Sequence, residues 1–274
     1  MTVDVSPLAS IAPGATLADD VFVGPFCVVG PEAKIGRGTR LLNNVTLMGR
    51  VELGEHNTLY PGVVLGGEPQ APRRRQSPDG GVVVGDQNTF REGATVNRGF
   101  DPRTPTRIGS HNYLMANSHV GHDCRLGDQI VLAGAVLLGG CVHVEDAAVL
   151  SGAVIVHPYA TVGAYSFVVG QTRLLHDVPP FTLVDGQPDR VRGLNQVGVQ
   201  RAKLAPHLVA ALSEACRLLF REKFSLDDAL SQVAEQFGPA TEIERWFEFL
   251  RRQRDGKHGR ARDRQRMAVT EGAA

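Results

Sequence analysis

The sequence predicts a mainly β protein, a parallel β-helix of short strands followed by a small C-terminal α-helical domain. An aliphatic residue recurs at every sixth position over most of residues 5–174, and the chain then changes to apolar residues at helical spacing. Glycine is frequent, at 31 of 274 residues, whereas aromatic residues make up only 6%. This composition favours many tight turns over a core of large rings.

Composition and charge exclude several classes of protein. The 29 Lys and Arg residues balance the 29 Asp and Glu residues, which argues against a globally basic nucleic-acid binder. No basic N-terminal leader and no run of about 18 apolar residues occurs, so we expect no transmembrane segment. The cysteines, Cys27, Cys124, Cys141 and Cys216, lie far apart, which favours reduced thiols and a cytoplasmic protein.

The six-residue period is the strongest signal. Stepping by six from Val5 meets Ile, Leu or Val at every position as far as Leu65, and a second run extends from Ile108 to Leu174. Between them the phase returns briefly, at residues 84–96. A short strand and a tight turn, with one aliphatic side chain pointing inward, explain this period, so the chain is expected to coil.

The hexapeptide pattern resembles the left-handed parallel β-helix, in which three hexads form one coil of 18 residues. The left hand follows from this resemblance alone, because the general preference for right-handed crossovers would predict the opposite. Residues 18 apart then stack at the inter-strand spacing of about 4.8 Å. We assign residues 1–190 to this domain.

The two breaks in the period predict loops that leave the coil. They span residues 66–83 and 97–107, and both are rich in Pro, Gly and Arg. Insertions in a solenoid often build its binding face. Two interpretations stay open, solvated surface loops or contact with phosphate through arginine.

Three helices are expected after the coil, within residues 191–254. Pro206 can start the first, which runs to about Glu222. Ser225 begins a capping box for a second helix that ends near Gly238, and Thr241 begins another for the third. Residues 255–274 are basic and poor in apolar residues, so we expect a disordered tail.

Polar residues concentrate in the segment 117–124, which contains His122 and Asp123. Counting 18 onward from His122 reaches Gly140, and 18 more reaches Pro158, which follows His157. A histidine beside a carboxylate, with a glycine backbone about 5 Å away, supplies what acyl transfer needs: a general base, a group that orients it and an oxyanion donor. A lone histidine is more often a surface or core residue, so this pattern does not settle the function by itself.

Several motifs together resemble the acyl-carrier-protein-dependent UDP-N-acetylglucosamine 3-O-acyltransferase family, which begins lipid A synthesis. The resemblance spans about residues 7–253, hexads and C-terminal helices included. The motifs are Gly24-Pro25-Phe26-Cys27, Asn97-Arg98-Gly99, His119-Val120-Gly121-His122-Asp123-Cys124, Asp177-Val178-Pro179-Pro180-Phe181, Gly186-Gln187-Pro188 and Gly193-Leu194-Asn195.

The resemblance implies a reaction and a site. His122 would be the general base, Asp123 would orient it, and the Gly140 N–H would hold the oxyanion, with no metal, no cofactor and no covalent enzyme intermediate. The acyl group, a 3-hydroxyacyl group in the expected case, would pass from acyl carrier protein to the sugar. The family is a homotrimer with active sites between subunits. Substrate contacts are expected from Gln70, His119, Cys141 and His157 at the sugar and acyl sites, Asn195 and Arg201 on the nucleotide side, and Gly170 as the limit of acyl length.

The sequence also departs from the family at positions that would contact the acceptor. Cys141 stands where a histidine is usual, Ala71 follows Gln70 in place of an acidic residue, and Pro158 replaces a glutamine. Val197 and Ala202 replace an acidic and a basic residue near the nucleotide. An altered acceptor is therefore an open alternative, because such contacts set specificity.

Three classes of function remain. The first is O-acylation of a UDP-sugar, or its variant, N-acylation of a 3-amino sugar. The second is a metal lyase like the γ-class carbonic anhydrases, which hold zinc with three histidines. The third is a non-catalytic scaffold. For an acidic carrier protein, the expected contacts are Arg173, Arg217, Arg221 and Lys223, aided by the basic tail.

Overall fold

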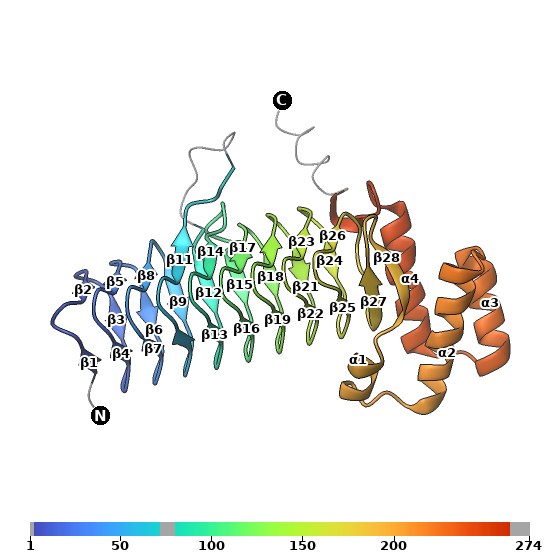
Figure 1. The fold of residues 1–274 in the computed structure, drawn as a ribbon, viewed down its shortest axis with the longest axis horizontal. Coiled ribbons are helices and arrows are strands. Elements are labelled where there is room, and N and C mark those ends of the chain that lie inside the picture. Colours follow the sequence, from blue (N-terminus) through green and yellow to red (C-terminus); the bar gives the residue numbers. More distant parts are fainter. Residues whose placement is uncertain (1–2, 72–79, 264–274) are drawn as a thin grey trace.

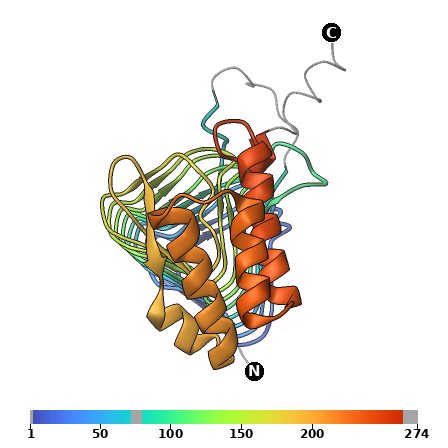
Figure 2. The same cartoon turned by 90° about the vertical axis from the view of Figure 1, so that its right-hand side faces the viewer.

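A computed structural model of the chain describes residues 3–71 and 80–263. It is a long parallel β-helix with helices gathered at its C-terminal end (Figure 1). Seen along the coil axis, the strands stack in register behind the helical domain (Figure 2). Among the described residues, no helix combines the length and apolarity needed to cross a membrane.

The strands form three parallel faces. Face A contains β1 (Asp4–Val5), β4 (Phe22–Val23), β7 (Arg40–Leu41), β10 (Thr58–Leu59), β13 (Thr89–Phe90), β16 (Tyr113–Leu114), β19 (Val131–Leu132), β22 (Val149–Leu150), β25 (Phe167–Val168), β27 (Thr182–Asp185) and β28 (Arg190–Leu194). Face B contains β2 (Ser10–Ile11), β5 (Val28–Val29), β8 (Thr46–Leu47), β11 (Val64–Gly67), β14 (Thr95–Asn97), β17 (His119–Val120), β20 (Leu137–Leu138), β23 (Ile155–Val156) and β26 (Arg173–Leu174). Face C contains β3 (Thr16–Leu17), β6 (Lys34–Ile35), β9 (Val51–Leu53), β12 (Val82–Val84), β15 (Thr106–Ile108), β18 (Arg125–Leu126), β21 (His143–Val144) and β24 (Thr161–Val162).

The predicted hexad residues form the core. Each is the inward residue of its strand, and from Val23 to Leu174 all are at most 4% exposed. Val120 pairs with Leu138, and Leu138 with Val156, so the 18-residue register is confirmed. Full burial of such a side chain contributes roughly 1.5–3 kcal/mol, and the aliphatic column therefore holds the coils together.

The corners of the coil do not all depend on glycine. The left-handed backbone conformation falls on glycine at some corners and on non-glycine residues at others, with φ of 57° at Asp123, 61° at Cys141 and 70° at Tyr159, which lie 18 apart. Gly121, which follows the inward Val120, instead permits close stacking: a Cβ there would lie 2.9 Å from the Gly140 nitrogen. Glycine after the aliphatic residue thus serves coil-to-coil contact.

Both predicted insertions leave the coil as loops. The first lies between β11 and β12 and the second between β14 and β15 (Figure 1). Residues 72–79 of the first loop lie outside the described residues. The second ends earlier than predicted, because β15 begins at Thr106.

The C-terminal part contains elements that the sequence did not reveal. After the last hexad, β27 continues face A in parallel and β28 pairs with it antiparallel, so the sheet of face A extends to Leu194. A short helix precedes the predicted three. The helical elements are α1 (Gln196–Arg201), α2 (Pro206–Cys216), η1 (Arg217–Arg221), α3 (Leu226–Phe237), α4 (Thr241–Asp255) and η2 (Ala261–Asp263).

The capping predictions have different outcomes. The Ser225 Oγ accepts the Asp228 N–H at 3.1 Å, which confirms the capping box of α3. The box predicted at Thr241 is wrong, because α4 starts there and its N-cap is Ala240, whose side chain makes no capping bond. The Trp246 Nε1 donates to the Pro180 carbonyl at 2.9 Å and so ties α4 to the end of the coil.

The expected disordered tail is wrong for its first part. Residues 256–263 fold back against the coil, where Arg260 and Asp263 are only 5% and 8% exposed. These two form an ion pair at 2.8 Å, which the high charge of the segment concealed at the sequence level. Residues 264–274 lie outside the described residues.

Candidate active site

A cavity of about 460 Å³ opens on face B beside strands β17, β20, β23 and β26. Its floor is apolar and is formed by strand residues, Leu137, Leu138, Ile155, Val156 and Leu174. Its polar lining includes the predicted site residues Gln70, His119, His122, Gly140 and His157, which come from the first insertion and from three successive coils.

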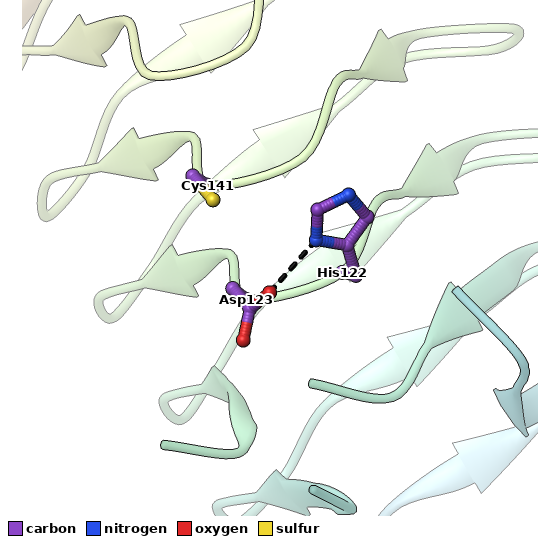
Figure 3. A group of neighbouring side chains, drawn as sticks. All are labelled: His122, Asp123 and Cys141. Carbon is purple, nitrogen blue, oxygen red and sulfur yellow. Dashed lines mark hydrogen bonds and ion pairs between the residues drawn. The ribbon is translucent and has the colours of Figure 1, made fainter. Parts of the chain in front are cut away.

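His122 and Asp123 form a directed pair at the corner after β17. The His122 Nδ1 lies 2.8 Å from the Asp123 Oδ2, and each side chain is 19% exposed (Figure 3). Since a carboxylate only accepts, Nδ1 carries the proton. The Nε2 of the neutral ring is then an acceptor, as a general base requires.

The electrostatic surroundings favour a proton on His122. Burial lowers its pKa, but hydrogen bonds to Asp123 and Cys141 outweigh burial and raise the pKa to about 9. For His119 the balance is opposite, because burial and the neighbouring His122 lower its pKa. The pKa values of two histidines on one coil are therefore shifted in opposite directions, as in many acid–base sites.

Gly140 packs directly against the imidazole of His122. A Cβ at residue 140 would overlap the Cε1 and Nε2 of that ring, so any side chain there would displace the imidazole. Within the described residues the Gly140 N–H donates no hydrogen bond, whereas the next N–H, of Cys141, donates to the His122 carbonyl at 2.8 Å. An uncommitted N–H beside the base is what an oxyanion donor needs.

His119 and His157 each have one ring nitrogen engaged. The Nδ1 of His119 lies 2.8 Å from the Thr95 Oγ1. The Nδ1 of His157 donates to the Pro158 carbonyl at 2.9 Å, which leaves Nε2 as an acceptor. Both rings line the cavity and are half-buried, so they can hydrogen-bond a polar ligand.

The loop at 97–107 supports the catalytic pair, a role that the sequence did not reveal. The Phe100 N–H donates to the Asp123 Oδ1 at 3.1 Å, and the Asp123 N–H donates to the Thr106 Oγ1 at 2.9 Å. The Phe100 ring meets the His122 ring edge-on, with centroids 4.7 Å apart. No periodicity marks these residues, because they lie in a break of the hexads.

Asn97 is a further polar residue of the cavity that sequence reasoning left without a role. Its side chain is 6% exposed, and its Nδ2 donates to the Glu68 carbonyl at 2.7 Å. Its Oδ1 is buried and accepts no hydrogen bond from the described residues. This amide can therefore accept a hydrogen bond from a bound ligand.

Cys141 lies next to the catalytic pair. Its Sγ, a ring nitrogen of His122 and a carboxylate oxygen of Asp123 lie within 4.8 Å of one another (Figure 3). The zinc alternative requires three histidines around one ion, and in the part of the chain that the structure describes His119, His122 and His157 form no such group.

Other predicted site residues lie away from this cavity in the single chain. Gly170 is at the corner after β25, and Asn195 precedes α1, where its Nδ2 donates to the Tyr165 carbonyl at 2.8 Å. Arg201 is exposed at the end of α1. Among the departures from the family, Pro158 lines the cavity, whereas Val197 is 65% exposed on α1.

The arginines and lysine expected to contact a carrier protein fall into two groups. Arg173 lines the first cavity, and Arg221 and Lys223 line a second cavity of about 640 Å³ between the last coil and the helices. Arg190 and Arg192 line it as well, which increases its positive charge. Arg217 is less available, because it forms ion pairs with two glutamates of its own domain.

The comparisons agree with this architecture. The family described as "Udp N-acetylglucosamine O-acyltransferase; Domain 2" matches residues 177–259. An acyl-[acyl-carrier-protein]–UDP-N-acetylglucosamine O-acyltransferase of Thermodesulfovibrio yellowstonii is 35% identical over 92% of this chain and 98% of its own length. One of Stutzerimonas stutzeri is 37% identical over 87% of this chain and 93% of its own.

Solved structures extend the likeness to three dimensions. The crystal structure of a UDP-N-acetylglucosamine acyltransferase from Bacteroides fragilis superposes with a TM-score of 0.85 at 29% identity, over 90% of this chain and 96% of that one. The enzyme from Moraxella catarrhalis gives 0.81 at 33% identity, over 90% and 96%. With identity above 30% along most of its length, the chain belongs to the family of acyl-[acyl-carrier-protein]–UDP-N-acetylglucosamine O-acyltransferases.

Proposed function

We propose that the protein transfers a fatty acyl group from acyl carrier protein to the 3-hydroxyl of UDP-N-acetylglucosamine, in lipid A biosynthesis. The observation that carries the proposal is the pairing of His122 with Asp123 beside the Gly140 N–H, at the edge of a cavity with an apolar floor. The relatives are named for both substrates, which supports the proposal.

His122 acts as the general base in the proposed reaction. Its Nε2 takes the proton of the sugar hydroxyl while that oxygen attacks the thioester carbonyl carbon. Asp123 keeps the proton on Nδ1 and stabilises the imidazolium that forms. Removal of such a base costs about two to four orders of magnitude in rate.

Gly140 acts as the oxyanion donor. As the tetrahedral intermediate forms, its N–H donates to the oxygen that was the thioester carbonyl. The intermediate then collapses, the carbon–sulfur bond breaks, and the imidazolium returns its proton to the leaving thiolate. An ester and the free thiol of the carrier protein result, and no metal or covalent enzyme intermediate takes part.

The apolar floor of the cavity is suited to the hydrocarbon chain, and the polar side chains around it to the sugar. Asn97 and His157 offer acceptors, and Gln70 also lines the cavity. We assign Asn195 and Arg201 to the nucleotide and Gly170 to the limit of the acyl groove. Because these three lie away from the cavity of one chain, the assignment requires a neighbouring subunit.

A homotrimer supplies such a neighbour. Val28, Leu137 and Ile155 point outward on face B and are 47%, 42% and 48% exposed. Exposed aliphatic residues along one face of a sheet are what a subunit interface would cover. Sedimentation equilibrium tests the trimer, and a monomer at assay concentration would contradict it.

We also propose a cytoplasmic location and an acidic carrier protein as donor. The described cysteines, Cys27, Cys124, Cys141 and Cys216, are all unpaired, in keeping with a reducing compartment. Arg221 and Lys223, with the other cations of the second cavity, would steer the acidic donor.

Mass spectrometry of products tests the function. The purified protein is incubated with acyl carrier proteins of several chain lengths, with and without a 3-hydroxyl group, and with UDP-N-acetylglucosamine or its 3-amino analogue. Ester formation on the hydroxyl acceptor supports the proposal. Product on the amine alone would replace the proposed O-acylation with N-acylation. This acceptor is included because Cys141 stands at a position where a histidine is usual in the family. No product with any donor would refute acyl transfer.

A further inference from the structure

The segment after α4 forms a compact strap across the end of the coil. Lys257 and Arg260 pair in an isolated antiparallel β-bridge, and η2 follows. Gly259 has φ of 69°, and a Cβ there would lie 2.5 Å from the ring of His176. A left-handed glycine pressed against the coil marks a turn that the fold specifies closely.

Asp177 ties this strap to the coil and to α4 through four hydrogen bonds, two of which reach the strap itself. Its Oδ2 accepts the Ala261 N–H at 2.9 Å, and its N–H donates to the Gly259 carbonyl at 2.8 Å. Its Oδ1 accepts the Thr161 N–H at 2.7 Å, and its carbonyl accepts the Gln253 Nε2 at 2.7 Å. The 4% exposed Asp177 thus joins strap, coil and α4, independently of the active site.

Arg262 extends from the strap to the active-site corner. Its Nη1 donates to the Cys141 carbonyl at 2.5 Å, across 121 residues of sequence. Cys141 directly follows Gly140, and its own N–H donates to the His122 carbonyl. The corner that carries Gly140 is therefore held on one side by His122 and on the other by Arg262.

We propose that Arg262 is a positioning residue, which fixes the orientation of the Gly140–Cys141 corner and hence of the oxyanion donor beside His122. Because the strap is held firmly against the coil, the hydrogen bond from Arg262 to the Cys141 carbonyl fixes that corner relative to the strap. The inference rests on the proposed acyl transfer. It adds a contribution from residues beyond the family match at 177–259.

His143 provides a readout of this contact that is independent of turnover. Burial lowers its pKa, and the positive charges of Arg262 and Arg125 lower it further, to about 3. Removal of the Arg262 charge should therefore raise the pKa of His143. An NMR titration of the imidazole follows this directly.

The test compares Arg262→Gln with Arg262→Lys and with the control Arg252→Gln. Arg252 is 70% exposed on α4 and pairs with Glu248 alone on its helix. At saturating substrates we expect Arg262→Gln to lower kcat about tenfold, the size of one net hydrogen bond to a charged group, with KM within twofold. Arg262→Lys keeps the charge and a donor, so it should restore part of the rate, and the control should match the wild type.

A variant of the strap itself separates positioning from stability. Asp263→Asn weakens the ion pair with Arg260 and leaves Arg262 in place. We expect it to lower the thermal midpoint at least as much as Arg262→Gln while kcat remains near the wild type. If kcat falls equally in both variants, if the loss in Arg262→Gln is confined to KM, or if its His143 pKa is unchanged, the positioning role is overturned. Wild-type protein without acyl transfer would instead refute the proposed function.

Discussion

Gly140→Ala adds a single carbon atom, and we expect it to impair catalysis without impairing folding. The added Cβ would fall on the Cε1 and Nε2 of His122, whereas ordinary contacts of a Cβ begin at 3.4 Å. The imidazole must therefore move by about 1 Å, and a misplacement of that size costs about a hundredfold in rate. The swing would also lengthen the 2.8 Å bond from His122 to Asp123. Because a side chain, not the backbone, gives way, we expect the variant to fold normally.

The assay measures initial rates at saturating donor and acceptor, with thermal denaturation as the check on folding. Gly152→Ala is the matched control, because a Cβ there meets only the Gly134 carbonyl, at 3.6 Å. We expect kcat of Gly140→Ala to be about a hundredfold lower than that of Gly152→Ala at similar thermal midpoints. A difference of less than about threefold would refute the close packing of Gly140 on the catalytic base.

The remaining predictions concern the base, its pKa, the groove and the strap. His122→Ala should reduce turnover by about two to four orders of magnitude without unfolding, and near wild-type turnover would exclude it as the base. Only neutral imidazole accepts a proton, so kcat/KM should rise with pH towards the His122 pKa of about 9. Asp123→Asn should move the inflection of this profile to lower pH, because the Asp123 hydrogen bond raises the His122 pKa. An unmoved inflection would assign the titration to another group. Gly170→Met should shorten the preferred acyl chain, as read by product mass spectrometry, and an unchanged profile would place the groove elsewhere. Deletion of residues 264–274 should leave kcat within about twofold of the wild type. Deletion of residues 256–274 also removes Arg262 and should lower kcat about tenfold or more. Equal rates for the two truncated proteins would contradict a role for the strap.

The fold and half of the site could be predicted because both follow the coil period. Each inward aliphatic residue identified one strand, and the 18-residue repeat alone predicted that Gly140 lies beside His122. The start of the helix capped by Ser225 could be predicted as well, because its capping box lies within the four residues from Ser225 to Asp228.

The rest of the site could not be predicted, because it depends on contacts without a period. Phe100 reaches the catalytic pair from an irregular loop, and Arg262 reaches the adjacent Cys141 carbonyl from 121 residues away. The basic composition of the last residues suggested solvation, and only the structure reveals the buried carbonyls and carboxylates that these arginines meet. Non-local polar pairing of this kind leaves no pattern in a single sequence.

The antiparallel strand β28 hinders end-to-end association of these molecules in solution. A parallel coil that simply stopped after β26 would present rows of unpaired N–H and C=O groups, onto which another coil could stack end to end. Here the chain reverses at β28, and the Trp246 indole and the strap occupy the carbonyls of Pro180 and Leu175 at the same end. The reversal therefore works as a terminator against filament growth, and it leaves the two-residue strands β1, β2 and β3 as the weaker, opposite edge.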